Sequence, residues 1–125
     1  MEPLKIDSTE SSPFVALDPK NHRFEISGNS FPSNALEFYD PILKWLNEYL
    51  KYPIEHTEFN FKLDYFNSTS AKFLTEILML LAKLKEDGHD LNIVWHYYVD
   101  DDEMRYAGDE LSNLTEVDFE FVTYE

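Results

Sequence analysis

The chain has 125 residues, 43% hydrophobic and 16% aromatic, which is enough apolar surface for one folded core and too little length for two. Ten Lys and Arg against 25 Asp and Glu give a formal charge of −15, which excludes nucleic acids and anionic membranes as expected partners. The lack of cysteine excludes disulfides, thiolate nucleophiles and zinc-thiolate sites. From its length we expect a single domain over residues 1–125. Because the sequence has no recognisable targeting signal and no apolar run of membrane-spanning length, we expect a cytoplasmic protein.

Short extended segments separated by turn residues occupy the N-terminal third. Small antiparallel strands are predicted at Leu4–Ser8, Phe14–Leu17 and Arg23–Ile26. A loop is predicted at Gly28–Asn34, in which Ser33 or Asn34 is a suitable N-cap for the helix that follows.

The next segment, Ala35–Leu50, has the periodicity of a helix. Apolar residues recur at spacings of three and four, at Leu36, Tyr39, Leu43, Leu46 and Leu50, and this stripe is widened by Phe38, Ile42, Trp45 and Tyr49. Pro41 either begins a fresh segment capped by Asp40 or kinks one continuous helix.

Alternating apolar residues then predict a strand at Phe59–Tyr65, with Phe59, Phe61, Leu63 and Tyr65 on its buried face. The leucine-rich run Thr69–Glu86 predicts the best helix in the chain, and Leu91–Tyr98 predicts a second central strand. Because a helix of this length connects them, these two strands should lie parallel in one sheet.

The C-terminal third opens with acidic residues, Asp100 to Glu103. They lead into a short helix predicted to end near Leu111, and Phe119–Val122 makes a last strand. The expected fold is therefore α/β, a mixed sheet whose helices Ala35–Leu50 and Thr69–Glu86 cover one or both faces.

Three consecutive hydroxyl residues, Ser68, Thr69 and Ser70, lie where the strand gives way to the strongest helix. Capping by Asn67 or Ser68 explains one hydroxyl. Three exceed what a cap needs, and a phosphoryl group there would meet free helix amides and Lys72, one turn on from Ser68. The sequence thus leaves two alternatives open, a phosphorylation switch and plain capping in a constitutive binding protein.

Catalysis is the weaker interpretation. No histidine has a spacing that places a base beside the hydroxyls, and the three glycines form no phosphate-binding loop. Asp101 and Asp102 could serve a small metal-dependent hydrolase, but acidic residues at a helix start are stabilising without a metal. We therefore expect a protein that is not an enzyme and has no cofactor and no metal site.

Four segments together carry a resemblance to a known family. They are Gly28–Pro32, Leu63–Lys72, Val94–Tyr98 and Asp101–Met104. In this order and at these spacings, over nearly the whole chain, they resemble the SiaC family of regulatory phosphoproteins.

The resemblance implies a fold like that of the anti-sigma-factor antagonists (STAS-like), with a hydroxyl residue at a helix start that a serine/threonine kinase phosphorylates and a PP2C-type phosphatase restores. It places the phosphoacceptor after Asn67, on Ser68, with Thr69 as the alternative because the family usually has threonine there. It also implies that the unphosphorylated form binds and activates a diguanylate cyclase in cyclic-di-GMP signalling. The expected partner-binding residues are Asp64, Asn67, Ser68, Thr69, Ser70 and Lys72.

Overall fold

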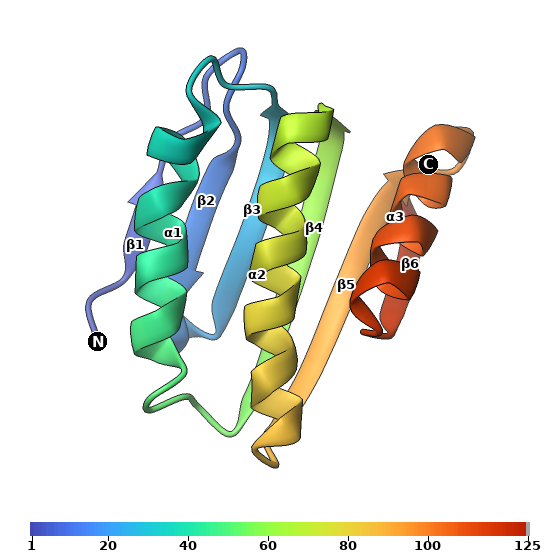
Figure 1. Cartoon of the computed structure of the whole chain (residues 1–125). Coiled ribbons are helices and arrows are strands. Elements are labelled where there is room, and N and C mark those ends of the chain that lie inside the picture. Colours follow the sequence, from blue (N-terminus) through green and yellow to red (C-terminus); the bar gives the residue numbers. More distant parts are fainter. Residues whose placement is uncertain (125) are drawn as a thin grey trace.

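The computed structural model describes residues 1–124, which form one mixed six-stranded sheet and three α-helices (Figure 1). The strands are β1 Leu4–Ile6, β2 Phe14–Asp18, β3 Arg23–Ser30, β4 His56–Phe66, β5 Asp90–Tyr98 and β6 Phe119–Tyr124. The helices are α1 Ala35–Tyr49, α2 Ser68–Glu86 and α3 Asp102–Thr115, with a 3₁₀ turn, η1, at Pro19–Asn21. The α/β prediction is confirmed.

The strands lie in the sheet in the order in which they occur in the chain. β1, β2 and β3 pair antiparallel, and β3 to β6 pair parallel, so the predicted pairing of the two central strands, β4 and β5, is correct. Each parallel connection contains one helix. Right-handed crossovers that all advance in one direction place their helices on the same face, and Figure 1 shows the three helices together on one side of the sheet.

The helix-covered face of the sheet carries the core. Trp95 of β5 is almost completely buried there, with its ring centroid 5.6 Å from that of Phe61 and 5.6 Å from that of Phe119. The opposite face has no helix in the described chain and is more polar; there Nε2 of His96 lies 2.9 Å from Oδ1 of Asn60. Burial lowers the pKa of His96, and the nearby Lys62 lowers it further. The sheet thus separates an apolar interior from a half-exposed polar surface.

The first correction concerns β3, which runs to Ser30 and so includes the start of the predicted loop. Gly28 has φ +102°, a backbone conformation that suits glycine, and the register with β4 shifts between Gly28 and Asn29. This bulge lets the strand continue until Ser30 is buried. A glycine among polar residues suggests a turn in the sequence, and only the pairing with β4 reveals the strand.

Helix α1 is continuous through Pro41 and is capped by Asn34, whose side chain accepts from the amide of Glu37. Its buried residues are Ala35, Tyr39, Ile42, Leu46 and Tyr49, and all but Ala35 belong to the predicted stripe or to the residues that widen it. Leu36, expected in the core, is 65% exposed. The buried face is therefore centred on Tyr39, Ile42, Leu46 and Tyr49, and the ring of Tyr49 packs against Phe24 of β3.

The remaining differences are small. β4 begins before the predicted Phe59 and ends at Phe66, but Tyr65 lies exposed beyond the part of the strand that the helices cover. Helix α2 begins at Ser68, one residue early, and α3 continues a turn past Leu111 to Thr115. Within residues 1–124, the helices are all too short or too polar to span a membrane.

Candidate functional site

The three consecutive hydroxyl residues occupy three different environments at the start of α2. Asn67 is the N-cap, and its Oδ1 accepts from the amide of Ser70 at 2.9 Å. Ser68 and Thr69 are exposed, whereas Ser70 is completely buried. The amides of Ser68 and Thr69 have no acceptor one turn earlier in the helix, which makes this end of α2 favourable for negative charge.

Beneath the exposed pair lies a buried hydroxyl cluster, which consists of Ser30, Tyr39 and Ser70. Tyr39 OH and Ser30 Oγ are 2.6 Å apart, and Ser30 Oγ donates to Ser70 Oγ at 2.8 Å. The amide of Asn67 also donates to the carbonyl of Ser30 at 3.0 Å. Burial raises the pKa of Tyr39, so its hydroxyl stays protonated and available as a donor.

This cluster corrects one predicted site residue. Ser70 was expected on the partner-binding surface, but its side chain bonds inward and is inaccessible to another protein. It instead fixes the first turn of α2 to the end of β3 and to α1. Of the other expected residues, Asp64, Ser68, Thr69 and Lys72 are exposed and Asn67 is half-buried. They lie at one edge of the sheet, where β4 ends and α2 begins.

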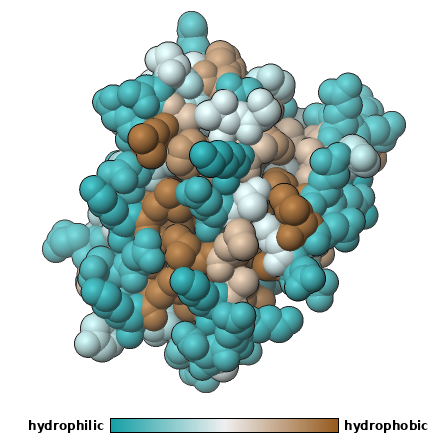
Figure 2. Space-filling view, viewed as in Figure 1, coloured by the Kyte–Doolittle hydropathy of each residue, from teal (hydrophilic) through white to brown (hydrophobic). Residues whose placement is uncertain are grey.

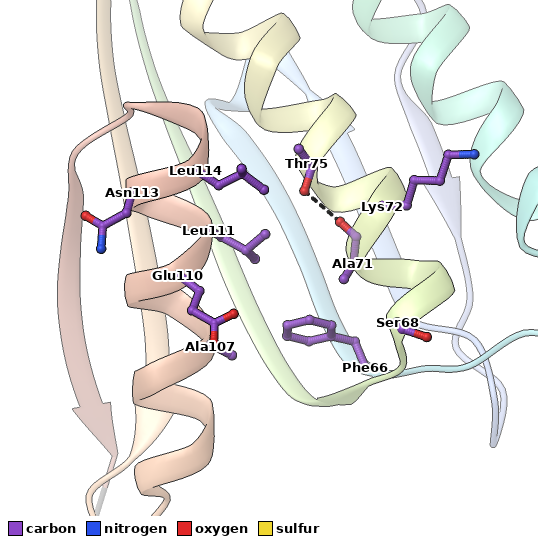
Figure 3. A pocket seen from close by; sticks show the side chains of 10 residues that line it. All are labelled: Phe66, Ser68, Ala71, Lys72, Thr75, Ala107, Glu110, Leu111, Asn113 and Leu114. Atoms are coloured by element: carbon purple, nitrogen blue, oxygen red, sulfur yellow. Dashed lines mark hydrogen bonds between the residues drawn. The ribbon is translucent and has the colours of Figure 1, made fainter.

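A groove of about 700 Å³ runs between α2 and α3, with Ser68 among its lining residues (Figure 3). Its lining from β4 and α2 is Phe66, Ser68, Ala71, Lys72 and Thr75, and α3 contributes Ala107, Glu110, Leu111, Asn113 and Leu114. Most of these side chains are apolar or small, and Leu114 is 70% exposed. Figure 3 shows the Lys72 side chain directed away from α3.

The position of α3, which forms one wall of the groove, depends on Gly108. A Cβ at this position would lie 2.6 Å from Nε1 of Trp95 and 2.9 Å from the ring of Phe121. Trp95 also donates from Nε1 to the carbonyl of Met104 at 3.0 Å. The helix therefore lies close to the sheet because one residue has no side chain and an indole hydrogen bond holds the first turn.

The acidic residues before α3 lie close to the same edge. Asp64, Asp101 and Glu103 line a second, smaller pocket of about 220 Å³ with Tyr65 and Phe66. Asp101 is the N-cap of α3 and accepts from the amide of Met104, as expected for carboxylates at a helix start. No group of three His, Asp or Glu side chains within residues 1–124 is arranged to hold a metal ion.

Two features of this edge escaped the sequence analysis. Phe31 and Tyr65 pack edge to face, with ring centroids 5.9 Å apart, and both are about half exposed. The second is the α3 wall of the groove, because no short-range pattern brings Leu111 and Leu114 beside a helix 40 residues earlier. For Ser70 a signal was present, since it lies three residues before Phe73 and seven before Ile77, on the buried stripe of α2.

Comparison with known proteins identifies the family. The model of the SiaC family regulatory phosphoprotein matches residues 6–124. The chain belongs to the SiaC family. It is also 30% identical over 97 residues, 78% of this chain and 77% of the relative, to the uncharacterized protein PA14_02130 of Pseudomonas aeruginosa strain UCBPP-PA14.

Solved SiaC structures share the fold over the whole chain. Apo-SiaC from P. aeruginosa superposes with a TM-score of 0.85 at 26% identity and covers 100% of both chains. A structure of SiaC described as the activator of the diguanylate cyclase SiaD, solved in complex with it, superposes with a TM-score of 0.89 at 25% identity and covers 97% of this chain and 99% of that one. The predicted family and the predicted STAS-like fold are thus both correct.

Proposed function

We propose that this protein regulates a diguanylate cyclase by direct binding and that phosphorylation of Ser68 weakens the binding. In this proposal the unphosphorylated form activates the cyclase, a serine/threonine kinase adds the phosphate, and a PP2C-type phosphatase removes it. The protein itself catalyses no reaction. Support for the cyclase as the partner comes from the related SiaC of P. aeruginosa. Its structure was solved in complex with the diguanylate cyclase SiaD, and SiaC is described there as the activator of SiaD. A cytoplasmic location remains a prediction of the sequence.

The observation that carries the choice of Ser68 is the division of roles among the residues of the junction. Asn67 already caps the helix and Ser70 is buried in the hydroxyl cluster, so neither capping nor packing requires the hydroxyl of Ser68. Ser68 is exposed and borders the groove, where a kinase can reach it and a bound partner would cover it. Thr69 is also exposed and is the alternative acceptor.

We propose the groove between α2 and α3 as the surface that the cyclase covers. Its apolar floor, formed by residues such as Phe66 and Leu111, offers area whose burial stabilises a complex. Asp64, Asn67, Thr69 and Lys72 border the same end of α2 and complete the proposed partner-binding surface. The exposed pair Phe31 and Tyr65 extends it along the edge of the sheet, because half-exposed aromatic side chains suit protein interfaces.

The switch follows from local electrostatics. A phosphoserine carries a charge of about −1.5 to −2 at neutral pH, and at Ser68 it would join a chain whose formal charge is already −15. In the free protein, the first-turn amides of α2 and water stabilise this charge. In the complex, the phosphate would be stripped of water beside an apolar groove that also contains Glu110, at a large cost in binding free energy.

The test compares variants of Ser68 in binding and activation of the SiaD-type cyclase of the same organism. Ser68→Ala should bind and activate like the wild type and should resist the kinase. Ser68→Asp and the phosphorylated protein should bind at least ~10-fold more weakly, as expected when a charge is buried without a partner. Calorimetry gives the affinity, and the rate of cyclic-di-GMP formation from GTP gives the activation.

Ser8→Asp is the matched control, because Ser8 is exposed in a loop and receives the same change. Equal cyclase binding by Ser68→Ala and Ser68→Asp would contradict the switch and favour a constitutive binding protein. Phosphate transfer that persists in Ser68→Ala and disappears in Thr69→Ala would move the acceptor to Thr69.

A further inference from the structure

A second surface feature lies on the outer side of α2, away from the α3 groove. Five exposed residues follow each other at spacings of four, three, four and three: Lys72, Glu76, Met79, Lys83 and Glu86. Spacings of three and four keep residues on one side of a helix, so these five form a single line, here called the α2 stripe. Its central residue, Met79, is 58% exposed and is the apolar member of the stripe.

The charges of the α2 stripe are arranged antisymmetrically about Met79. Lys72 and Glu86 lie seven residues on either side of it, and Glu76 and Lys83 lie three residues before and four after. At a rise of 1.5 Å per residue, the outer charges are each about 10 Å from the centre and the inner charges about 5 Å. Each positive charge therefore has a negative counterpart at the mirrored position.

These four charges are not neutralised within the described chain. The salt bridges of residues 1–124 join other side chains, and none includes Lys72, Glu76, Lys83 or Glu86. Lys72 and Glu76 are spaced for an intrahelical pair but do not form one within 4.0 Å. The stripe thus presents two cations and two anions that are available to an intermolecular partner.

An apolar groove of about 410 Å³ lies along the stripe on the side of α1. It is lined by Leu43 and Asn47 from α1 and by Glu76, Met79, Leu80 and Lys83 from α2. Figure 2 shows hydrophobic side chains gathered in a strip between these two helices, with hydrophilic residues around it. A methionine at the edge of such a groove can fill the same groove of a second molecule, because its side chain is flexible and adapts to irregular space.

We propose that the α2 stripe is a self-association surface, on which a second copy of this chain packs α2 antiparallel to α2 about a two-fold axis near Met79. In this arrangement Glu76 of each copy meets Lys83 of the other, and Lys72 meets Glu86. The two Met79 side chains lie at the centre and fill the grooves beside Leu43 and Leu80. A two-fold interface requires a patch that is complementary to itself, and the antisymmetric charges meet this requirement.

Self-association on this surface uses residues that, apart from Lys72, are separate from those of the proposed cyclase switch. The groove that contains Ser68 lies on the α3 side of α2, whereas Leu43 and Leu80 lie on the α1 side. Only Lys72 belongs to both surfaces. The dimer is expected to be weak and dependent on concentration, because a contact centred on one helix buries less area than a permanent interface and each copy carries a charge of −15.

Charge reversal tests the proposal with the whole chain. Sedimentation equilibrium of the wild type from about 10 µM to about 1 mM should give a reversible dimer, in the range expected for small transient interfaces. Glu76→Lys and Lys83→Glu should each raise the dissociation constant at least ~10-fold, because each places like charges opposite one another twice. An equimolar mixture of these two variants should form a heterodimer, and the double variant Glu76→Lys/Lys83→Glu should regain the homodimer.

Glu55→Lys is the control, since Glu55 is exposed in the loop before β4 and undergoes the same change of charge. It should dimerise like the wild type, and Met79→Glu should not dimerise. A wild type that stays monomeric to about 1 mM would overturn the proposal. A dimer whose dissociation constant is unchanged by charge reversal on the α2 stripe would also overturn it. If the protein never dimerises and the charge reversals weaken cyclase binding, the stripe would instead belong to the cyclase-binding surface. None of these outcomes depends on phosphorylation of Ser68.

Discussion

Ser68 and Ser70 are separated by one residue, yet they belong to different parts of the molecule. Two steps along an α-helix turn the chain by about 200°, so the side chain of Ser68 is exposed to solvent while that of Ser70 faces β3 and α1. Ser70 hydrogen-bonds inside the fold, and Ser68 is among the residues that line the groove proposed as the partner-binding surface. The comparison teaches that a helix can bury one hydroxyl of a run inside the fold and leave another exposed, where the proposed phosphorylation requires it.

Helix α1 carries two buried tyrosines, one near each end, and the hydroxyl of each lies close to a buried hydroxyl of the sheet. Tyr39 reaches Ser30 at the carboxyl end of β3, and Tyr49 OH lies 2.8 Å from Thr57 Oγ1 at the start of β4. Burial raises the pKa of both phenols. Only the Tyr39 cluster touches the first turn of α2, so it alone should influence Ser68.

The largest expected effect comes from placing the same charge at the two serines. Ser70→Asp should lower the free energy of unfolding by about 3–5 kcal/mol, because it buries a carboxylate without a cation. Ser68→Asp should leave stability unchanged or raise it by up to about 1 kcal/mol, because the charge lies at the N-terminus of a helix. Urea denaturation followed by tryptophan fluorescence measures both. Similar losses in the two variants would break the comparison.

Removal of the Tyr39 hydroxyl should have the next largest effect. Tyr39→Phe leaves Ser30 without one partner in a buried cluster and should cost about 1–3 kcal/mol. It should also slow phosphorylation of Ser68 by the kinase, because the first turn of α2 loses part of its support.

Tyr49→Phe serves as the control for this prediction. It should cost a similar amount of stability, since it removes a buried hydrogen bond to Thr57. The rate of phosphorylation, however, should stay at the wild-type value in folded protein. If both variants slowed the kinase equally, the effect would be one of general stability, and the Tyr39 cluster would have no special link to Ser68.

A smaller effect on stability is expected from substitution of Asn67. This substitution tests whether Asn67 alone caps helix α2 and leaves the hydroxyl of Ser68 available for phosphorylation. Asn67→Ala should cost about 1 kcal/mol of stability, the usual value for loss of an N-cap. Asn34→Ala should cost a similar amount at the start of α1. Hydrogen exchange of the Ser70 amide reports directly on the lost bond. An unchanged exchange rate in Asn67→Ala would mean that the Ser68 hydroxyl can act as the cap and that its availability for phosphorylation has been overestimated.

The smallest effect concerns His96, which is half-buried on the open face and so lies between the two serines in exposure. Its folded pKa is below the ordinary value of about 6.5, mainly because of burial. The unfolded chain therefore binds the proton first as the pH falls, and stability decreases below about pH 6.5. In His96→Gln this part of the loss should be absent, so the stability of the wild type relative to the variant should decrease as the pH falls from 7 to 5. Parallel curves would contradict the lowered pKa.

Much of the fold could be predicted because it rests on local patterns. The alternation from Phe59 to Leu63 and the leucine periodicity of α2 identify a strand and a helix. The order of strand, helix and strand makes the pairing of β4 and β5 parallel. The position of the hydroxyl run at the junction likewise depends only on residues that are close together in the chain, and the family resemblance depends on the order and spacing of four such short segments.

The tertiary structure decided which surfaces these elements present. The sequence could not show that every helix lies on one face, since this follows from the strand order, nor that Leu36 faces solvent while Tyr39 is buried. It also could not place Leu114 and Ser68 in one groove, because the groove exists only where α2 and α3 pack on neighbouring strands. Periodicity gives each element a buried side through short-range geometry, whereas grooves and buried hydroxyl clusters need contacts between residues that are far apart in the chain.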